Sequence, residues 1–164
     1  MEFKIDRLCP EDWDQVRAIY EAGIATRNTT FETEVPSWAR WDAAHLPTPR
    51  VVARARTHVL GWAALSPVSA RSVYAGVAEA SVYVDTHFTR RGIGRALLES
   101  LIGLSEKSGI WTLQAGVFPE NVASVALCKS CGFREVGRRE RISRLDGVWR
   151  DVLLFERRRK VTGI

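Results

Sequence analysis

The 164-residue chain is poor in cysteine and histidine, with three of each. Cys128 and Cys131 form a C-x-x-C pair, but a zinc site needs two further ligands at similar spacing, and the histidines are scattered. An odd number of cysteines without a recognisable signal peptide favours reduced thiols. We therefore expect no metal site and no disulfide.

Long apolar runs are also missing. No segment approaches the ~18 apolar residues of a membrane-spanning helix, and residues 1–6 contain no apolar run. We expect a soluble cytoplasmic protein with no membrane partner. With 46% hydrophobic residues, the chain can bury a core of its own, which predicts a single domain over residues 1–164.

The formal net charge is +5, and many of the basic residues lie between 139 and 160 on a predicted hairpin and tail. We interpret them as solvated strand faces, because they show no aromatic and basic ribbon of a nucleic-acid reader. No nucleic-acid partner is expected. A polyanionic cofactor would account for part of the charge balance.

Strand and helix patterns alternate along the chain without repeats or low-complexity linkers. Strand patterns cover residues 3–8, 51–56, 59–65, 79–85, 111–117, 133–143 and 148–157. Helical patterns cover residues 10–20, 36–45, 121–129 and a segment containing Leu97, Leu98, Leu101 and Leu104. This order predicts an α/β (α+β) fold with a mixed central sheet flanked by helices.

The most informative segment joins the strand residues Val82, Tyr83 and Val84 to a helix through a loop rich in arginine and glycine. The loop residues are Arg90, Arg91, Gly92, Ile93, Gly94, Arg95 and Ala96. The first turn of a helix has unpaired amides and the positive end of the dipole, so it stabilises an anion. The glycines let the backbone approach that anion, and the arginines add charge-assisted hydrogen bonds. We expect a pyrophosphate site.

Two nucleotide-binding motifs do not fit this loop. A Walker loop needs Lys followed by Ser or Thr after its last glycine, but Arg95 stands in the place of that Lys. A dinucleotide fingerprint needs a third small residue, but Leu97 stands there.

The loop instead resembles the acyl-CoA loop of the GNAT N-acetyltransferases, whose signature is Gln or Arg, two residues, Gly, one residue, then Gly or Ala. The chain as a whole is similar to the phosphinothricin and methionine sulfoximine acetyltransferases. The matching segments are residues 28–32, 70–71 with Tyr74, 79–84, Asn121 with Ser124, 131–133 and 147–152. The resemblance implies about seven strands splayed between the fourth and fifth, about four helices, and acetyl-CoA as co-substrate.

The resemblance also implies where acetyl-CoA binds. The pantetheine arm would pair with free backbone groups of Val82, Tyr83 and Val84, and Asn121 with Ser124 would contact the cofactor across the gap. Asn121 is equally well explained as a helix N-cap, where Asn is favoured.

Two candidate catalytic residues follow from the resemblance. Glu79 would accept a proton from the substrate ammonium, and a backbone amide of its strand would stabilise the developing oxyanion. The alternative for Glu79 is a surface salt bridge. Cys128 stands where relatives place a Tyr or His as proton donor to the CoA thiolate; the alternative is a small packed residue.

The acceptor substrate would be bound by Thr30, Phe31, Arg71 and Tyr74. The fork of Arg71 suits a carboxylate or phosphinate, and Phe31 supplies an apolar wall. Ser69 replaces a family lysine, which removes one cationic contact.

Trp149 and Asp151 match a family segment near the subunit contact, so the resemblance implies a homodimer. The alternative is that Trp149 is a core residue and Asp151 a structural hydrogen-bond acceptor.

The expected activity is acetylation of the α-amino group of a glutamate-like amino acid by direct transfer. Candidate acceptors are phosphinothricin, methionine sulfoximine, methionine sulfone and arsenic analogues. The alternatives are acetylation of protein N-termini or polyamines, and a non-catalytic CoA-sensing module. The cation Arg71 disfavours polyamines.

Overall fold

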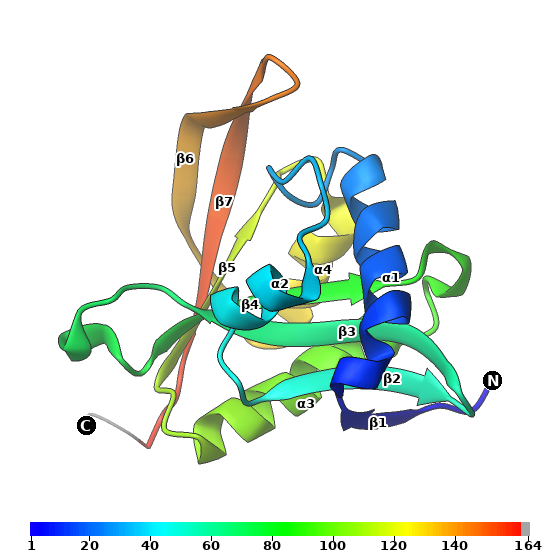
Figure 1. Ribbon diagram of the computed structural model, residues 1–164. Helices are drawn as coiled ribbons and strands as arrows, with labels where there is room; N and C mark the ends of the chain where they lie inside the picture. Colours follow the sequence, from blue (N-terminus) through cyan, green and yellow to red (C-terminus); the bar gives the residue numbers. More distant parts are fainter. Residues whose placement is uncertain (162–164) are drawn as a thin grey trace.

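The computed structural model describes residues 1–161 and contains one seven-stranded sheet in the spatial order β1-β2-β3-β4-β5-β7-β6 (Figure 1). The strands are β1 (Lys4–Arg7), β2 (Arg50–Ala55), β3 (His58–Pro67), β4 (Val77–Val84), β5 (Thr112–Val117), β6 (Arg134–Leu145) and β7 (Val148–Arg158). The β4–β5 pair is parallel and the other pairs are antiparallel. The predicted mixed sheet is confirmed.

Four α-helices cover the two faces of the sheet. One face carries α1 (Trp13–Ala25) and α2 (Trp38–Ala44), and the other carries α3 (Ile93–Lys107) and α4 (Val122–Ser130) (Figure 1). The first helix differs from the prediction at both ends. Residues Pro10–Asp12 form a separate 3-10 turn, and α1 continues to Ala25 because Gly23 and Ile24 extend its buried side. Within residues 1–161, no helix combines the length and apolar character that crossing a bilayer requires.

Each face of the sheet has its own hydrophobic core. The α3 face buries Ala78 with Leu97 and Leu101, while the α1 face packs Tyr83 against Trp62. Successive side chains of a strand point to opposite faces. Glu79 and Ser81 therefore share the α1 face with Tyr83.

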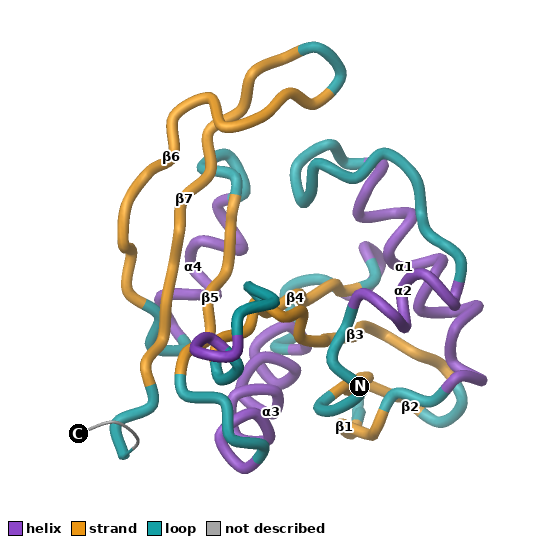
Figure 2. Tube along the Cα trace, turned by 60° about the vertical axis from the view of Figure 1, so that its left-hand side comes forward, coloured by secondary structure: helices purple, strands orange, loops and turns teal. Residues whose placement is uncertain are grey.

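The sheet opens between β4 and β5. These strands pair only at Val77 with Thr112, Ala78 with Leu113 and Glu79 with Gln114, although both continue for several residues (Figure 2). The other edge of β4 pairs with β3 as far as Val84. The predicted splay between the fourth and fifth strands is thereby confirmed, and residues 80–84 face β5 with no ladder partner there.

The start of α3 lies at the far end of this opening. A Cβ built on Gly94 would lie 3.5 Å from both Val84 Cγ2 of β4 and Leu127 Cδ2 of α4. The arginine and glycine loop therefore meets β4 and α4 at the point where the splay is widest.

Candidate active site

A cleft of about 420 Å³ occupies the opening between β4 and β5. Its walls come from segments far apart in the sequence: residues 79–83 and 114–117 of the two strands, the loop after α1, α4, and the β6–β7 hairpin. The catalytic, cofactor-binding and acceptor-binding sets predicted from the sequence therefore each contribute residues to one cavity.

Glu79 lies on the wall of this cleft where β4 and β5 separate. Its side chain is exposed, and its Oε2 accepts a hydrogen bond of 3.1 Å from Gln114 Nε2. One carboxylate oxygen is held by β5, while the group stays accessible from the cleft. The arrangement leaves Glu79 able to accept a proton from a bound molecule.

Tyr83 is fixed by aromatic packing on the α1 face. Its ring stacks on Trp62 at 4.8 Å and meets Tyr20 edge-on at 4.9 Å. Gly23 makes room for it, since a Cβ there would lie 2.8 Å from the Tyr83 ring. Burial raises the pKa of the Tyr83 phenol well above its usual value. The side chain thus anchors β4, while the backbone edge of residues 82–84 stays open toward β5.

Gly92 shapes the loop before α3. It has φ +77°, a left-handed conformation that favours glycine, and it caps α3 without any side-chain hydrogen bond. The free amides of the first helical turn are therefore not covered by a capping side chain. Arg95 pairs with Glu99 at 2.7 Å, and Arg91 lies over the Phe88 ring at 5.5 Å. The exposed residues Arg90, Arg91 and Arg95 make the helix start strongly positive.

Asn121 caps α4, as the capping interpretation predicts. Its Oδ1 accepts from the Ser124 amide at 3.1 Å, and its Nδ2 donates to the Asn28 carbonyl at 3.0 Å. Asn121 and Ser124 both line the cleft. The same side chain therefore caps the beginning of α4 and ties it to the loop after α1.

Cys128 lines the cleft but is buried in the α3-side core, 5% exposed. Burial, with a smaller contribution from Cys131, raises the pKa of its thiol to about 11. An ordinary thiol has a pKa of ~8.5, so proton transfer from Cys128 to a departing thiolate would be uphill. The environment favours the packing role over the acid role.

The structure brings half of the predicted acceptor set into the cleft. Thr30 and Phe31 line it, and Phe31 packs edge-on against Phe118 at 5.0 Å. Arg71 and Tyr74 instead lie exposed on the β3–β4 connection, with the Arg71 guanidinium over the Tyr74 ring at 5.4 Å. Neither is among the residues that line the cleft of this chain.

Two arginines near the cleft were not predicted as site residues. The sequence pattern places Arg139 of β6 on a solvated strand face, but in the structure it lines the cleft. Arg150 of β7 donates to the Arg27 carbonyl at 2.9 Å and pairs with Glu120 at 3.4 Å. Arg150 lies inside segment 147–152, which matches the family, and this was its only indication in the sequence. Nothing in the sequence pointed to Arg139.

The outer hairpin, formed by β6 and β7, carries Trp149 and Asp151, for which the sequence offers a core role and a hydrogen-bond acceptor role. The first role is wrong and the second is confirmed. Trp149 is 51% exposed, so it is no core residue. Asp151 is a structural acceptor: its carboxylate accepts from Arg138 Nε and from the Arg141 amide, each at 2.7 Å.

Comparisons with known proteins agree with this geometry. Phosphinothricin N-acetyltransferase of Streptomyces coelicolor is 32% identical over 155 residues, covering 90% of this chain and 91% of that protein. The ribosomal protein bS18-alanine N-acetyltransferase of Escherichia coli is 47% identical, but over 55 residues, which are 34% of this chain and 37% of that enzyme.

A solved structure gives the same fold. The GNAT superfamily phosphinothricin acetyltransferase of Sinorhizobium meliloti, in complex with acetyl-CoA, superposes with a TM-score of 0.86 at 26% identity, covering 96% of this chain and 89% of that one. Residues 13–133 match the family model described as acetyltransferase (GNAT) family. With this match over most of its length and with the splayed sheet in place, the chain belongs to the GNAT acetyltransferase family.

Proposed function

We propose that this acetyltransferase moves the acetyl group of acetyl-CoA to the α-amino group of a small glutamate-like amino acid. Phosphinothricin, methionine sulfoximine, methionine sulfone and arsenic analogues are the candidate acceptors. The observation that carries the proposal is the cleft itself, in which an accessible carboxylate, Glu79, stands beside the open edge of β4. Similarity to the Streptomyces enzyme over 90% of the chain supports the acceptor class.

The cofactor side of the cleft suits acetyl-CoA. Open backbone groups of residues 82–84 would bond the pantetheine amides, because strand edges need partners. Uncapped amides at the start of α3, with Arg90, Arg91 and Arg95, would hold the pyrophosphate. When bound, acetyl-CoA supplies the thioester.

Glu79 would accept the proton that the acceptor ammonium must lose before it can attack, either directly or through water. A backbone amide of β4 would stabilise the charge that develops on the carbonyl oxygen. The thiolate would depart without an acid, since the Cys128 thiol has its pKa raised to about 11. Transfer is direct, so no acetylated enzyme forms.

The test is release of CoA from acetyl-CoA with a panel of amines: phosphinothricin, methionine sulfoximine, methionine sulfone, glutamate, a peptide with a free N-terminus, and spermidine. Turnover confined to the amino acids supports the proposal. Glu79→Gln should then lower kcat/KM by about 100-fold or more, the usual loss when a general base is removed. Full activity of Glu79→Gln across pH would show that the base is elsewhere.

Acetylation of protein N-termini is the second candidate, favoured by the 47% identity to the bS18-alanine enzyme over 55 residues. Turnover on the peptide alone would establish it, and turnover on spermidine alone would point to polyamines. Binding of acetyl-CoA with no turnover would favour a CoA-sensing module.

We also propose a homodimer. The outer hairpin exposes several large apolar side chains, namely Val136, Ile142, Val148 and Trp149. Exposed apolar side chains gathered on one hairpin are typical of an interaction surface. Sedimentation of the purified protein tests this assignment.

A further inference from the structure

We propose that Arg139 of β6 binds an anionic group of the acceptor, a carboxylate or a phosphinate, and so selects acceptors that carry one. The inference rests on the proposed function, because it names the residue that recognises the acceptor in the same cleft. In the cleft of this chain, Arg139 rather than Arg71 supplies the positive charge.

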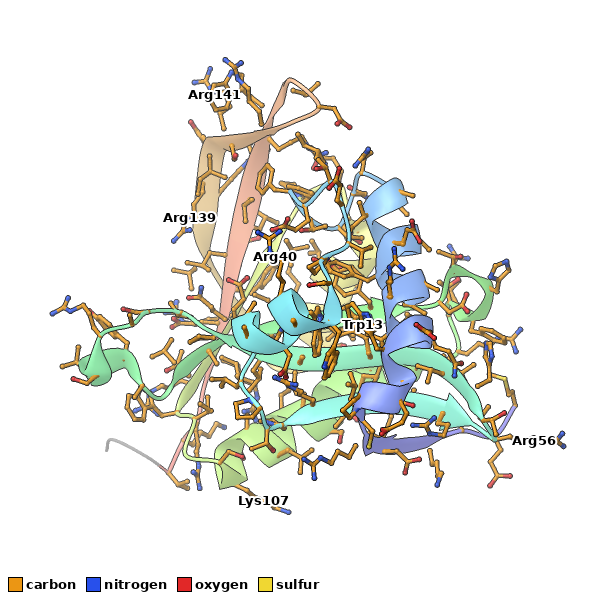
Figure 3. All side chains as sticks on the ribbon, viewed as in Figure 1. Trp13, Arg40, Arg56, Lys107, Arg139 and Arg141 are labelled. Atoms are coloured by element: carbon orange, nitrogen blue, oxygen red, sulfur yellow. The ribbon has the colours of Figure 1, made fainter. Side chains whose placement is uncertain are left out.

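Register places Arg139 on the wall of the cleft. Arg139 pairs with Val152 across the β6–β7 ladder, so the two side chains share a face. Val152 and, two residues later, Leu154 also line the cleft. Figure 3 shows Arg139 on β6, with Arg141 nearer the tip of the hairpin.

The same face continues across the sheet to Glu79. Leu154 pairs with Gly116 of β5, and a Cβ on Gly116 would lie 3.2 Å from Val152 Cγ1. Two residues before Gly116, Gln114 bonds the Glu79 carboxylate. Arg139 and Glu79 therefore stand on one continuous surface, at opposite sides of the cavity.

Neighbouring arginines are already engaged by the protein. Arg138 pairs with Asp151, Arg27 with Asp146 at 3.0 Å, and Arg150 with Glu120. Arg139 differs, because it makes no hydrogen bond or ion pair to any side chain within residues 1–161, and it is exposed. Its planar fork is thus free for a bidentate contact with a pair of anionic oxygens.

The charges of the cleft match an amino acid. Among the described residues that line it, the charged side chains are Glu79 and Arg139. An ammonium near Glu79 and an anion near Arg139 complement a zwitterionic acceptor, whereas a polyamine would meet repulsion at Arg139. A single cavity therefore both deprotonates the amine and fixes the other end of the molecule.

The test compares Arg139→Ala with Arg139→Lys and with the control Arg141→Asn. The control removes one charge from the same strand, outside the cleft, and Asn tolerates the φ of 46° at that position. For phosphinothricin, we expect Arg139→Ala to raise KM about tenfold or more, as a lost charged contact does, with kcat little changed. Arg139→Lys should recover part of the loss, and Arg141→Asn should match the unmodified protein.

Methionine sulfone has a neutral side chain, so a comparison with phosphinothricin tells whether Arg139 binds the α-carboxylate or the phosphinate. A rise in KM for both acceptors assigns the α-carboxylate to Arg139, and a rise for phosphinothricin alone assigns the phosphinate. Unchanged KM for both acceptors overturns the proposal, as does an equal effect of Arg141→Asn.

A second readout does not depend on turnover. Phenylglyoxal modifies accessible arginines, and mass spectrometry reports the extent at each one. Phosphinothricin should protect Arg139 and leave Arg141 reactive. If the protein acetylates none of the amines but protection is seen, the proposed function fails while the anion site stands. If phosphinothricin is acetylated and Arg139 stays unprotected, the anion site fails alone.

Discussion

The guanidinium of Arg150 lies over the ring of Phe118, 4.1 Å from its centre, in a cation–π contact with a residue that lines the cleft. The same guanidinium donates to the Arg27 carbonyl, and Asn28 Nδ2 donates to the Glu120 carbonyl at 3.4 Å. Strand β7, the turn after β5 and the loop after α1 are joined at this point. The connection spans the opening between the two halves of the sheet.

Arg150→Ala should loosen the loop that carries Thr30 and Phe31, which keeps its contacts to Asn121 and Asp146. We expect KM for the acceptor to rise about tenfold, roughly 1.4 kcal/mol, while the Kd for acetyl-CoA changes little because the cofactor loop lies elsewhere. Steady-state kinetics and calorimetry measure the two quantities. Arg134→Ala is the control, since Arg134 pairs with Glu156 between β6 and β7 and joins no loop. Equal effects of the two variants would contradict the role given to Arg150.

Gly94→Trp should weaken acetyl-CoA binding by more than about tenfold, because an indole beside Val84 and Leu127 would fill the space where the loop, β4 and α4 meet. Gly103→Trp is the matched control: it is the same substitution in the same helix, with nothing within 4 Å of the added Cβ. Isothermal titration of both variants gives the comparison. Intact affinity in Gly94→Trp would show that the loop does not hold the cofactor.

Cys128→Ala should leave kcat within about threefold of the unmodified protein, because loss of a true general acid costs about 100-fold or more. The variant should lose about 1 kcal/mol of stability from the small cavity in the core. Kinetics and urea unfolding check the two expectations. A large loss of kcat in both Cys128→Ala and Cys128→Ser, with stability retained, would assign the acid role to Cys128, because a serine hydroxyl keeps the size of the thiol but is a much weaker acid.

Stability should fall as pH is lowered through the range of histidine titration, because of His45. Its Nδ1 donates to the Trp41 carbonyl at 2.6 Å, and its ring stacks on Trp41 at 4.2 Å. Burial lowers the pKa of His45 below the ordinary 6.5, and nearby Arg50 lowers it further, against the opposing effects of the Trp41 carbonyl and Asp42. The unfolded chain thus binds a proton first, so the free energy of unfolding decreases as pH falls below that value.

Urea unfolding between about pH 7.5 and 5.5 measures this loss of stability. In His45→Gln, the free energy of unfolding should depend less on pH over the same range. The carboxylates with lowered pKa, Asp6 and Asp151, titrate below the ordinary 3.8 and do not contribute in this range. An equally steep dependence in His45→Gln would place the titrating group elsewhere.

The roles of the arginine and glycine loop and of Glu79 stay predictions, and that of Glu79 rests on the family resemblance rather than on a local pattern. Local patterns are sufficient to predict the strands, because alternation acts over a few residues. They failed for the hairpin. The β6–β7 register shifts between Arg139 and Ser143, so simple alternation no longer tells which side chains face the cleft. Arg71 shows the other limit: its place outside the cleft depends on the path of the β3–β4 connection, which no short motif specifies.

The open edge of β4 also bears on how long the protein survives in a cell. Under the proposed function, part of the sheet is completed by a metabolite, so the folded state is favoured by mass action whenever that metabolite is abundant. At a concentration 100 times its Kd, a ligand that binds only the folded chain adds about 2.7 kcal/mol. Starvation for acetyl-CoA would then lower the abundance of the enzyme as well as its turnover, through faster unfolding and proteolysis.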